Sequence, residues 1–184
     1  AEGPRLAPET HALVLTVSDG VASGHRTDAS GVAVAARLEA MGAIVDRGIV
    51  ADDPVAIAEK VREACARAGL VVTTGGTGLT PRDVTPQAVR SVLDYEIPGI
   101  GEAMRAAGRA STPLADLSRS LGGVCGRALV VCLPGSPRGA VESLAAIEGL
   151  LAHALETLAG PFDHGAAQRA LPVAYDRNRE EDAD

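Results

Sequence analysis

The sequence predicts an α/β fold in three layers, with a mostly parallel β-sheet covered by helices on both faces. Apolar runs of strand length alternate with segments of helical periodicity from Ala12 onward. The strand-like runs are almost continuously apolar, as expected for strands buried on both faces. The length of 184 residues and the hydrophobic fraction of 46% suit one globular domain with a substantial core.

The first strand is expected at residues 12–17, because ALVLTV is apolar and ends at the turn-forming Ser18-Asp19-Gly20. A helix should follow the next polar loop, with Asp28 or Ser30 as its cap, because Val34, Ala35, Leu38 and Met41 recur on one face. A second strand is expected at residues 43–50.

Asp53-Pro54 predicts the next helix start, since Asp accepts free amide bonds and Pro suits the first helical position. This helix should end at Gly69, followed by a strand over residues 70–74. Thr85-Pro86 repeats the pattern, which predicts a helix that Thr85 caps and that continues through Leu93.

A short helix is expected at residues 100–107, and a β-hairpin near residues 120–133 that turns at Gly126-Arg127. The apolar stripe of residues 140–158 predicts a long final helix. The expected domain organisation is a flexible N-terminal segment (1–11), a single α/β domain (12–160) and a partly flexible C-terminal extension (161–184).

The composition argues against several classes of partner. Nucleic acid is not expected, because the net charge is −7 and the aromatic fraction is only 2%. No membrane contact is expected, because no apolar run approaches transmembrane length. The three cysteines form no C-x-x-C pair and the four histidines have no zinc-type spacing, so a cytoplasmic protein without zinc is expected.

Polar, glycine-marked segments follow several of the expected strands: Ser18-Asp19-Gly20, Asp52, Gly75–Asp83 and Pro134-Gly135-Ser136. In a parallel α/β sheet, ligands bind outside the carboxyl ends of the strands, where the strand order reverses. These segments are therefore the candidate ligand site.

The glycine loop TTGGTGLTPRDVTPQA matches neither common nucleotide fingerprint. A dinucleotide motif needs glycine where Pro81 stands, and a phosphate loop of the Walker type needs a lysine that does not follow. The amides of Gly75, Gly76, Thr77 and Gly78 could still turn toward an anion, but a plain wide turn is an equal alternative at this point.

Asp52 and Asp83 border the same expected crevice. Each could be structural, because an aspartate near a helix N-terminus stabilises the helix. Together they suggest a Mg²⁺ site that would serve a nucleotide triphosphate.

The segments LTVSDG, IVADD, TTGGTGLTPRDVTPQA, LSRSLGG and LPGSPRG, in this order over residues 13–158, resemble the molybdopterin adenylyltransferases of molybdenum-cofactor biosynthesis. This family includes the bacterial MogA and MoaB types and the G domain of gephyrin. The resemblance implies a doubly wound fold, a homotrimer, and the reaction of molybdopterin with Mg-ATP to give adenylyl-molybdopterin and pyrophosphate. Mg²⁺ would be the cofactor, with ATP as co-substrate.

The resemblance also implies roles for individual residues. Asp52 and Asp83 match the two acidic residues linked to catalysis, which are also the expected Mg²⁺ ligands. The residues matching the molybdopterin- and ATP-binding positions are Ser18, Asp19, Gly75, Gly76, Thr77, Gly78, Ser118, Pro134, Gly135, Ser136 and Arg138. Ala51 departs from the usual proline before the first aspartate, and Arg138 stands where relatives often have lysine.

Other functions remain open at this level. The main alternative is a non-catalytic molybdopterin-binding or scaffolding paralogue. A molybdenum insertase normally has further domains, and a nicotinamide-dependent oxidoreductase is disfavoured by Pro81. The insertase and molybdopterin synthase are instead candidate partners.

Overall fold

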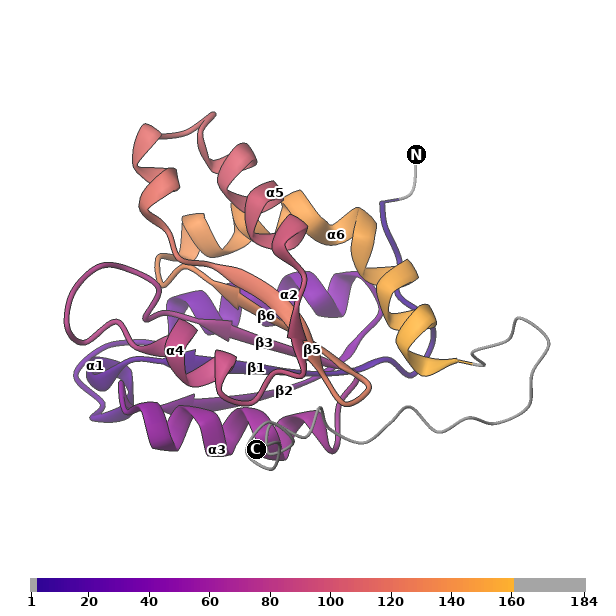
Figure 1. Ribbon diagram of the computed structural model, residues 1–184, viewed down its shortest axis with the longest axis horizontal. Coiled ribbons are helices and arrows are strands. Elements are labelled where there is room, and N and C mark those ends of the chain that lie inside the picture. The colour runs from indigo at the N-terminus through magenta and orange to yellow at the C-terminus, as the bar shows by residue number, and fades with distance from the viewer. Residues whose placement is uncertain (1–2, 161–184) are drawn as a thin grey trace, which may run out of the picture.

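The computed structural model describes residues 3–160. Its strands are β1 (His11–Val17), β2 (Ile44–Val50), β3 (Leu70–Thr74), β4 (Tyr95–Glu96), β5 (Leu121–Cys125) and β6 (Ala128–Leu133). They form one six-stranded sheet in the order β2-β1-β3-β6-β5-β4 (Figure 1). The four strands from β2 to β6 pair in parallel, whereas β5 and β4 are antiparallel to their neighbours. The mostly parallel sheet and the β5–β6 hairpin are therefore confirmed.

Helices cover both faces of this sheet. They are α1 (Asp19–Ala22), α2 (Ala29–Ala40), α3 (Pro54–Cys65), α4 (Thr85–Arg90), α5 (Pro98–Gly108) and α6 (Pro137–Ala159), with a 3₁₀-helix at Pro113–Leu117. The buried side chains of α2, α5 and α6 form one core cluster with the sheet, and those of α3 and α4 form a second one on the other face (Figure 1). The fold is thus doubly wound in three layers, as expected.

The two clusters follow from the alternation of side chains along the strands. Val14 and Val72 point into the first cluster, while their neighbours Leu15 and Val71 point into the second. A parallel strand between two helical layers is buried on both faces, so the side chains that point to either face can all be apolar. Complete burial of one such side chain stabilises the fold by roughly 1.5–3 kcal/mol.

Two of the predicted helix caps are present. The Asp53 side chain accepts a hydrogen bond from the Ala56 N–H at 2.8 Å, and Pro54 occupies the first turn of α3. At α2 the cap is Asp28 rather than Ser30, and its Oδ1 accepts from the Gly31 N–H at 3.0 Å.

The cap predicted at Thr85 is wrong. The residue before the helix is Val84, and α4 begins without any capping bond from a side chain. Thr85 is already the first helical residue; its N–H donates to the Gly76 carbonyl at 3.1 Å, and its completely buried hydroxyl makes no hydrogen bond. The helix also ends at Arg90 instead of Leu93, because Asp94 already pairs with the sheet through Val124.

Three short elements were not predicted: α1, β4 and the 3₁₀-helix. Each has five residues or fewer, too few to show a hydrophobic period. The two terminal segments expected to be flexible can be compared with the structure only at the N-terminal end. In the segment expected to be flexible, Leu6 is buried in the core and its N–H donates to the Met41 carbonyl at 2.9 Å. The extension expected at 161–184 lies outside the described residues. None of the helices between residues 3 and 160 has the length and apolar character needed to span a bilayer.

Truncating Arg37 to alanine should lower the free energy of unfolding by about 1–3 kcal/mol, because it leaves a buried carboxylate without its partner. Arg37, on α2, binds Glu148, on α6, through two hydrogen bonds of 2.5 and 2.7 Å, and Glu148 is only 4% exposed. Urea unfolding followed by circular dichroism measures the loss.

The exposed pair Lys60–Glu63, at 3.5 Å, is the matched control, and Glu63→Ala should change the same free energy by at most about 0.5 kcal/mol. Equal effects of the two truncations would contradict a special role of the α2–α6 pair.

Candidate functional site

The carboxyl ends of four parallel strands meet at one edge of the sheet. In the strand register Val17 lies opposite Val50, Thr16 opposite Thr74, and Thr74 opposite Leu133. The strand order reverses between β1 and β3, since β2 lies on one side of β1 and β3 on the other. Ligands of doubly wound proteins bind at this position.

A cleft of about 620 Å³ opens at this edge. It brings together seven residues singled out from the sequence: Ser18, Asp52, Gly75, Gly76, Asp83, Gly135 and Ser136. They come from the segments after β1, β2, β3 and β6, which are far apart in the chain. The parallel topology therefore brings these segments together around one cleft at the strand ends.

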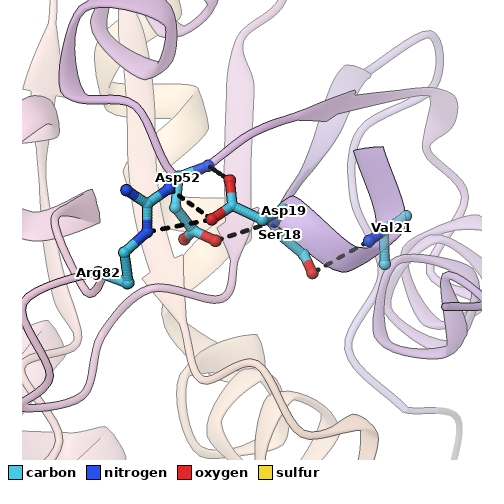
Figure 2. Close-up of polar contacts among 5 residues, drawn as sticks. All are labelled: Ser18, Asp19, Val21, Asp52 and Arg82. Carbon is cyan, nitrogen blue, oxygen red and sulfur yellow. Dashed lines mark hydrogen bonds and ion pairs between the residues drawn. The ribbon is translucent and has the colours of Figure 1, made fainter. Parts of the chain in front are cut away.

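Asp19 and Asp52 tie the ends of β1 and β2 together, as Figure 2 shows. The Asp19 N–H donates to Asp52 Oδ2 and the Asp52 N–H donates to Asp19 Oδ1, both at 2.9 Å. Ser18 caps α1 by accepting from the Val21 N–H at 3.3 Å. This reciprocal pairing fixes the Asp52 backbone beside the cleft and leaves Asp52 Oδ1 without a hydrogen bond to any described residue.

Arg82 lies against the same pair and was missed in the sequence (Figure 2). Its guanidinium forms an ion pair with Asp19 Oδ2. The hydrogen bond from the Asp52 backbone, together with Arg82, holds the pKa of Asp19 below its ordinary value. Asp19 is therefore a charged acceptor already satisfied by the protein, and it is not among the residues lining the cleft.

The turn after β3 requires glycine at two positions. Gly75 has φ = 107°, and a Cβ there would lie 2.3 Å from the Val17 carbonyl oxygen. Gly76 has φ = 68°, and a Cβ there would lie 2.2 Å from Thr85 Oγ1. The backbone after β3 therefore passes directly against the end of β1 at Gly75 and against Thr85 at Gly76, which leaves no room for a side chain at either position.

Asp83 closes the glycine loop on itself. Its Oδ2 accepts hydrogen bonds from the Thr80 N–H at 2.9 Å and the Thr80 hydroxyl at 2.7 Å. Partial burial opposes ionisation, but these bonds and one from the Gly78 amide lower the pKa of Asp83. The Asp83 carboxylate is ionised and engaged by its own loop, while it still borders the cleft.

Arg119 holds this loop from the other side and was also missed. Its backbone N–H donates to the Thr77 carbonyl at 3.0 Å, its Nε to the Gly78 carbonyl at 2.9 Å, and its NH2 group to the Asp83 carbonyl at 2.5 Å. Thr77 is buried, and neither Thr77 nor Gly78 is among the residues lining the cleft. The sequence feature that could have indicated Arg119 is its place in the motif LSRSLGG, next to the predicted binding residue Ser118.

A second hollow, of about 220 Å³, adjoins the first. Ser118 and Pro134 line it, and Ser136 lines both spaces. Ser136 also caps α6 by accepting from the Gly139 N–H at 3.1 Å. The N-terminus of this long helix therefore lies where the two spaces meet, and helix N-termini favour anions.

Arg138 lines neither of these spaces. Its side chain is 80% exposed and pairs with Glu142, one turn further along α6, at 2.8 Å.

The fold and the cleft define a doubly wound α/β protein with a ligand-sized site at the point where the strand order reverses. The chain belongs to the molybdopterin-binding family, because residues 13–154 match the family described as "Probable molybdopterin binding domain".

Solved structures agree with this assignment. The molybdopterin biosynthesis enzyme MoaB from Thermus thermophilus is 42% identical to this chain. The match covers 84% of this chain and 99% of the MoaB chain, with a TM-score of 0.77. The molybdopterin biosynthesis Mog protein from Mycobacterium ulcerans is 38% identical to this chain. The match covers 83% of this chain and 99% of the Mog chain, with a TM-score of 0.77.

Curated relatives include the molybdopterin adenylyltransferase of Helicobacter pylori strain 26695, 34% identical over 160 residues, which are 83% of this chain and 89% of the relative. The molybdenum cofactor biosynthesis bifunctional protein of Synechococcus elongatus is 42% identical over 176 residues. That match covers 90% of this chain but 55% of the relative, so the chain spans about half the length of the bifunctional protein.

Proposed function

We propose that the protein is a molybdopterin adenylyltransferase, which joins the adenylyl group of ATP to molybdopterin and releases pyrophosphate. The observation that supports this most directly is the cleft that places Asp52 beside the Gly75-Gly76 turn and the N-terminus of α6. The name of the Helicobacter pylori relative, a molybdopterin adenylyltransferase, supports the same reaction.

In the proposed reaction, the terminal phosphate of molybdopterin attacks the α-phosphorus of ATP. A new P–O bond forms there as the bond to the β-phosphate oxygen breaks, and pyrophosphate leaves with that electron pair. The chain's task is to position the two phosphates and stabilise the charge that develops between them. The backbone amides of Gly76 and of the α6 N-terminus near Ser136 would hold the anionic oxygens, because the Gly75 and Gly78 amides already bond to Leu133 and Asp83.

Mg²⁺ would be bound at this site by protein and nucleotide together. Within residues 3–160 no group of three or more acidic, histidine or cysteine side chains could hold a metal ion alone. Mg²⁺ in phosphoryl-transfer sites is usually held by one or two carboxylates together with substrate phosphates, whose charge it neutralises. Asp52 is the better candidate, because its Oδ1 is free of hydrogen bonds to described residues, whereas Asp83 is engaged by Thr80.

The second hollow would take the pterin end of molybdopterin. Ser118 and Arg105 line it and offer polar groups, and Ser136 connects it to the first cleft. Arg138 lines neither space, so it could contact a phosphate only after its side chain moves. Assembly as a homotrimer, a cytoplasmic location, and contacts with the molybdenum insertase and molybdopterin synthase belong to the same proposal; a monomer in light scattering at micromolar concentration would remove the trimer.

The direct test is to mix the purified protein with molybdopterin and Mg-ATP and to measure pyrophosphate. Release should require all three components and should stop when EDTA removes the divalent ion. Protein that binds molybdopterin, as seen by isothermal titration calorimetry, but never consumes ATP would instead be the non-catalytic scaffolding paralogue.

A further inference from the structure

Thr85 has a buried hydroxyl without a partner, directly beside Gly76, which lines the cleft. Among the described residues, only Thr73 and Thr85 have a buried side-chain oxygen that makes no hydrogen bond. Thr73 lies against the Cys132 thiol, which is a weak partner. Thr85 is completely buried in the first turn of α4, so its hydroxyl has lost its hydration without a replacement.

The Thr85 hydroxyl and Asp52 Oδ1 both lie close to Gly76. A Cβ placed on Gly76 would lie 2.2 Å from Thr85 Oγ1 and 3.4 Å from Asp52 Oδ1. The space there exists because residue 76 has no side chain. Asp52 Oδ2 is engaged by the Asp19 N–H at 2.9 Å, whereas Oδ1 makes no hydrogen bond to any residue of the described range.

A hydroxyl is a donor and a carboxylate oxygen is an acceptor with two lone pairs, so the two groups are chemically complementary. Oδ1 could accept from Thr85 and still present its second lone pair to a cation in the cleft. Carboxylates beside metals are commonly oriented by a hydrogen bond of this kind, and loss of such a partner typically reduces metal affinity or activity by about 10- to 100-fold.

We infer that Thr85 is a positioning residue, whose hydroxyl donates to Asp52 Oδ1 and orients this carboxylate toward Mg-nucleotide when the cleft is filled. The inference rests on the proposed function for the role of Asp52. A valine would have nearly the same shape as Thr85 without the unsatisfied hydroxyl, so packing alone does not explain a threonine here.

Thr85→Val and Thr85→Ser separate orientation from packing. Thr85→Val should unfold at a urea concentration no lower than that of the wild type, yet it should weaken Mg-dependent ATP binding in calorimetry, and lower kcat of pyrophosphate release, by about 10- to 100-fold. Thr85→Ser keeps the hydroxyl and should stay within about threefold of the wild type, on the scale of a modest hydrogen-bond change. An Asp52→Asn background should largely remove the effect of Thr85→Val.

Wild-type binding and turnover by Thr85→Val would overturn the inference, and so would a loss in Thr85→Ser as large as in Thr85→Val. If the wild-type protein binds Mg-ATP without releasing pyrophosphate, the proposed function fails, and the binding data alone decide on Thr85. Absence of Mg-ATP binding by the wild type would refute both.

Discussion

Asparagine at position 52 should lower the rate of pyrophosphate release by about 100- to 1000-fold, the usual loss when one electrostatic group of an active site is removed. Asn keeps an oxygen that can accept from the Asp19 N–H, so the hydrogen bonds between residues 19 and 52 at the ends of β1 and β2 should persist. It removes the negative charge that would face Mg-ATP. The measurement is kcat and KM for pyrophosphate release, together with the urea midpoint.

Asp46→Asn is the matched control, because it makes the same change at an exposed position of β2, far from the cleft. It should leave both rate and stability unchanged. Asp83→Asn should behave differently from either variant, because the Asp83 carboxylate holds Thr80 and the loop. Turnover and stability should fall together there. An Asp52→Asn enzyme with the wild-type rate at saturating Mg²⁺ would refute the role assigned to Asp52.

The second large effect concerns stability. Gly75→Ala should lower the free energy of unfolding by roughly 3–5 kcal/mol, because the added methyl would overlap the Val17 carbonyl oxygen in a backbone conformation that already disfavours side chains. Domains are typically stable by only about 5–15 kcal/mol, so this is a large share of the total. The chain has no tryptophan, so circular dichroism is the suitable probe of urea unfolding.

Gly126→Ala separates the two causes of this loss. Gly126 also has a positive φ, 62°, but a Cβ there would meet nothing within 4 Å. Its substitution should cost only about 1–2 kcal/mol, the conformational part alone. Equal losses in the two variants would show that the close approach of Gly75 to Val17 contributes nothing.

Local signals account for what could be predicted from the sequence. Asp53-Pro54 predicts a helix start from bonds within four residues, and Gly126-Arg127 predicts the hairpin turn in the same way. The location of the cleft followed from one further step, since parallel strands bring their carboxyl ends to a common edge.

The features that could not be predicted from the sequence depend on contacts between distant residues. Asp19 and Asp52 are 33 residues apart, and Arg119 reaches the glycine loop across about 40 residues, so both depend on the register of the finished sheet. At Thr85 the local rule fails: Thr-Pro is a good helix start, but the Thr85 hydroxyl is buried against Gly76 and makes no capping bond.

The close packing at Gly75 has a consequence for how this protein could be changed. Gly75 touches Val17, lies beside Gly135, and its N–H donates to the Leu133 carbonyl at 3.1 Å, so the floor of the cleft is also the junction of β1, β3 and β6. Redesigning the cleft for another ligand from this floor would therefore weaken the whole sheet. Arg26 and Thr27 offer more freedom, because they line the same cleft and are exposed, and variation there can reshape the cleft while the junction stays intact.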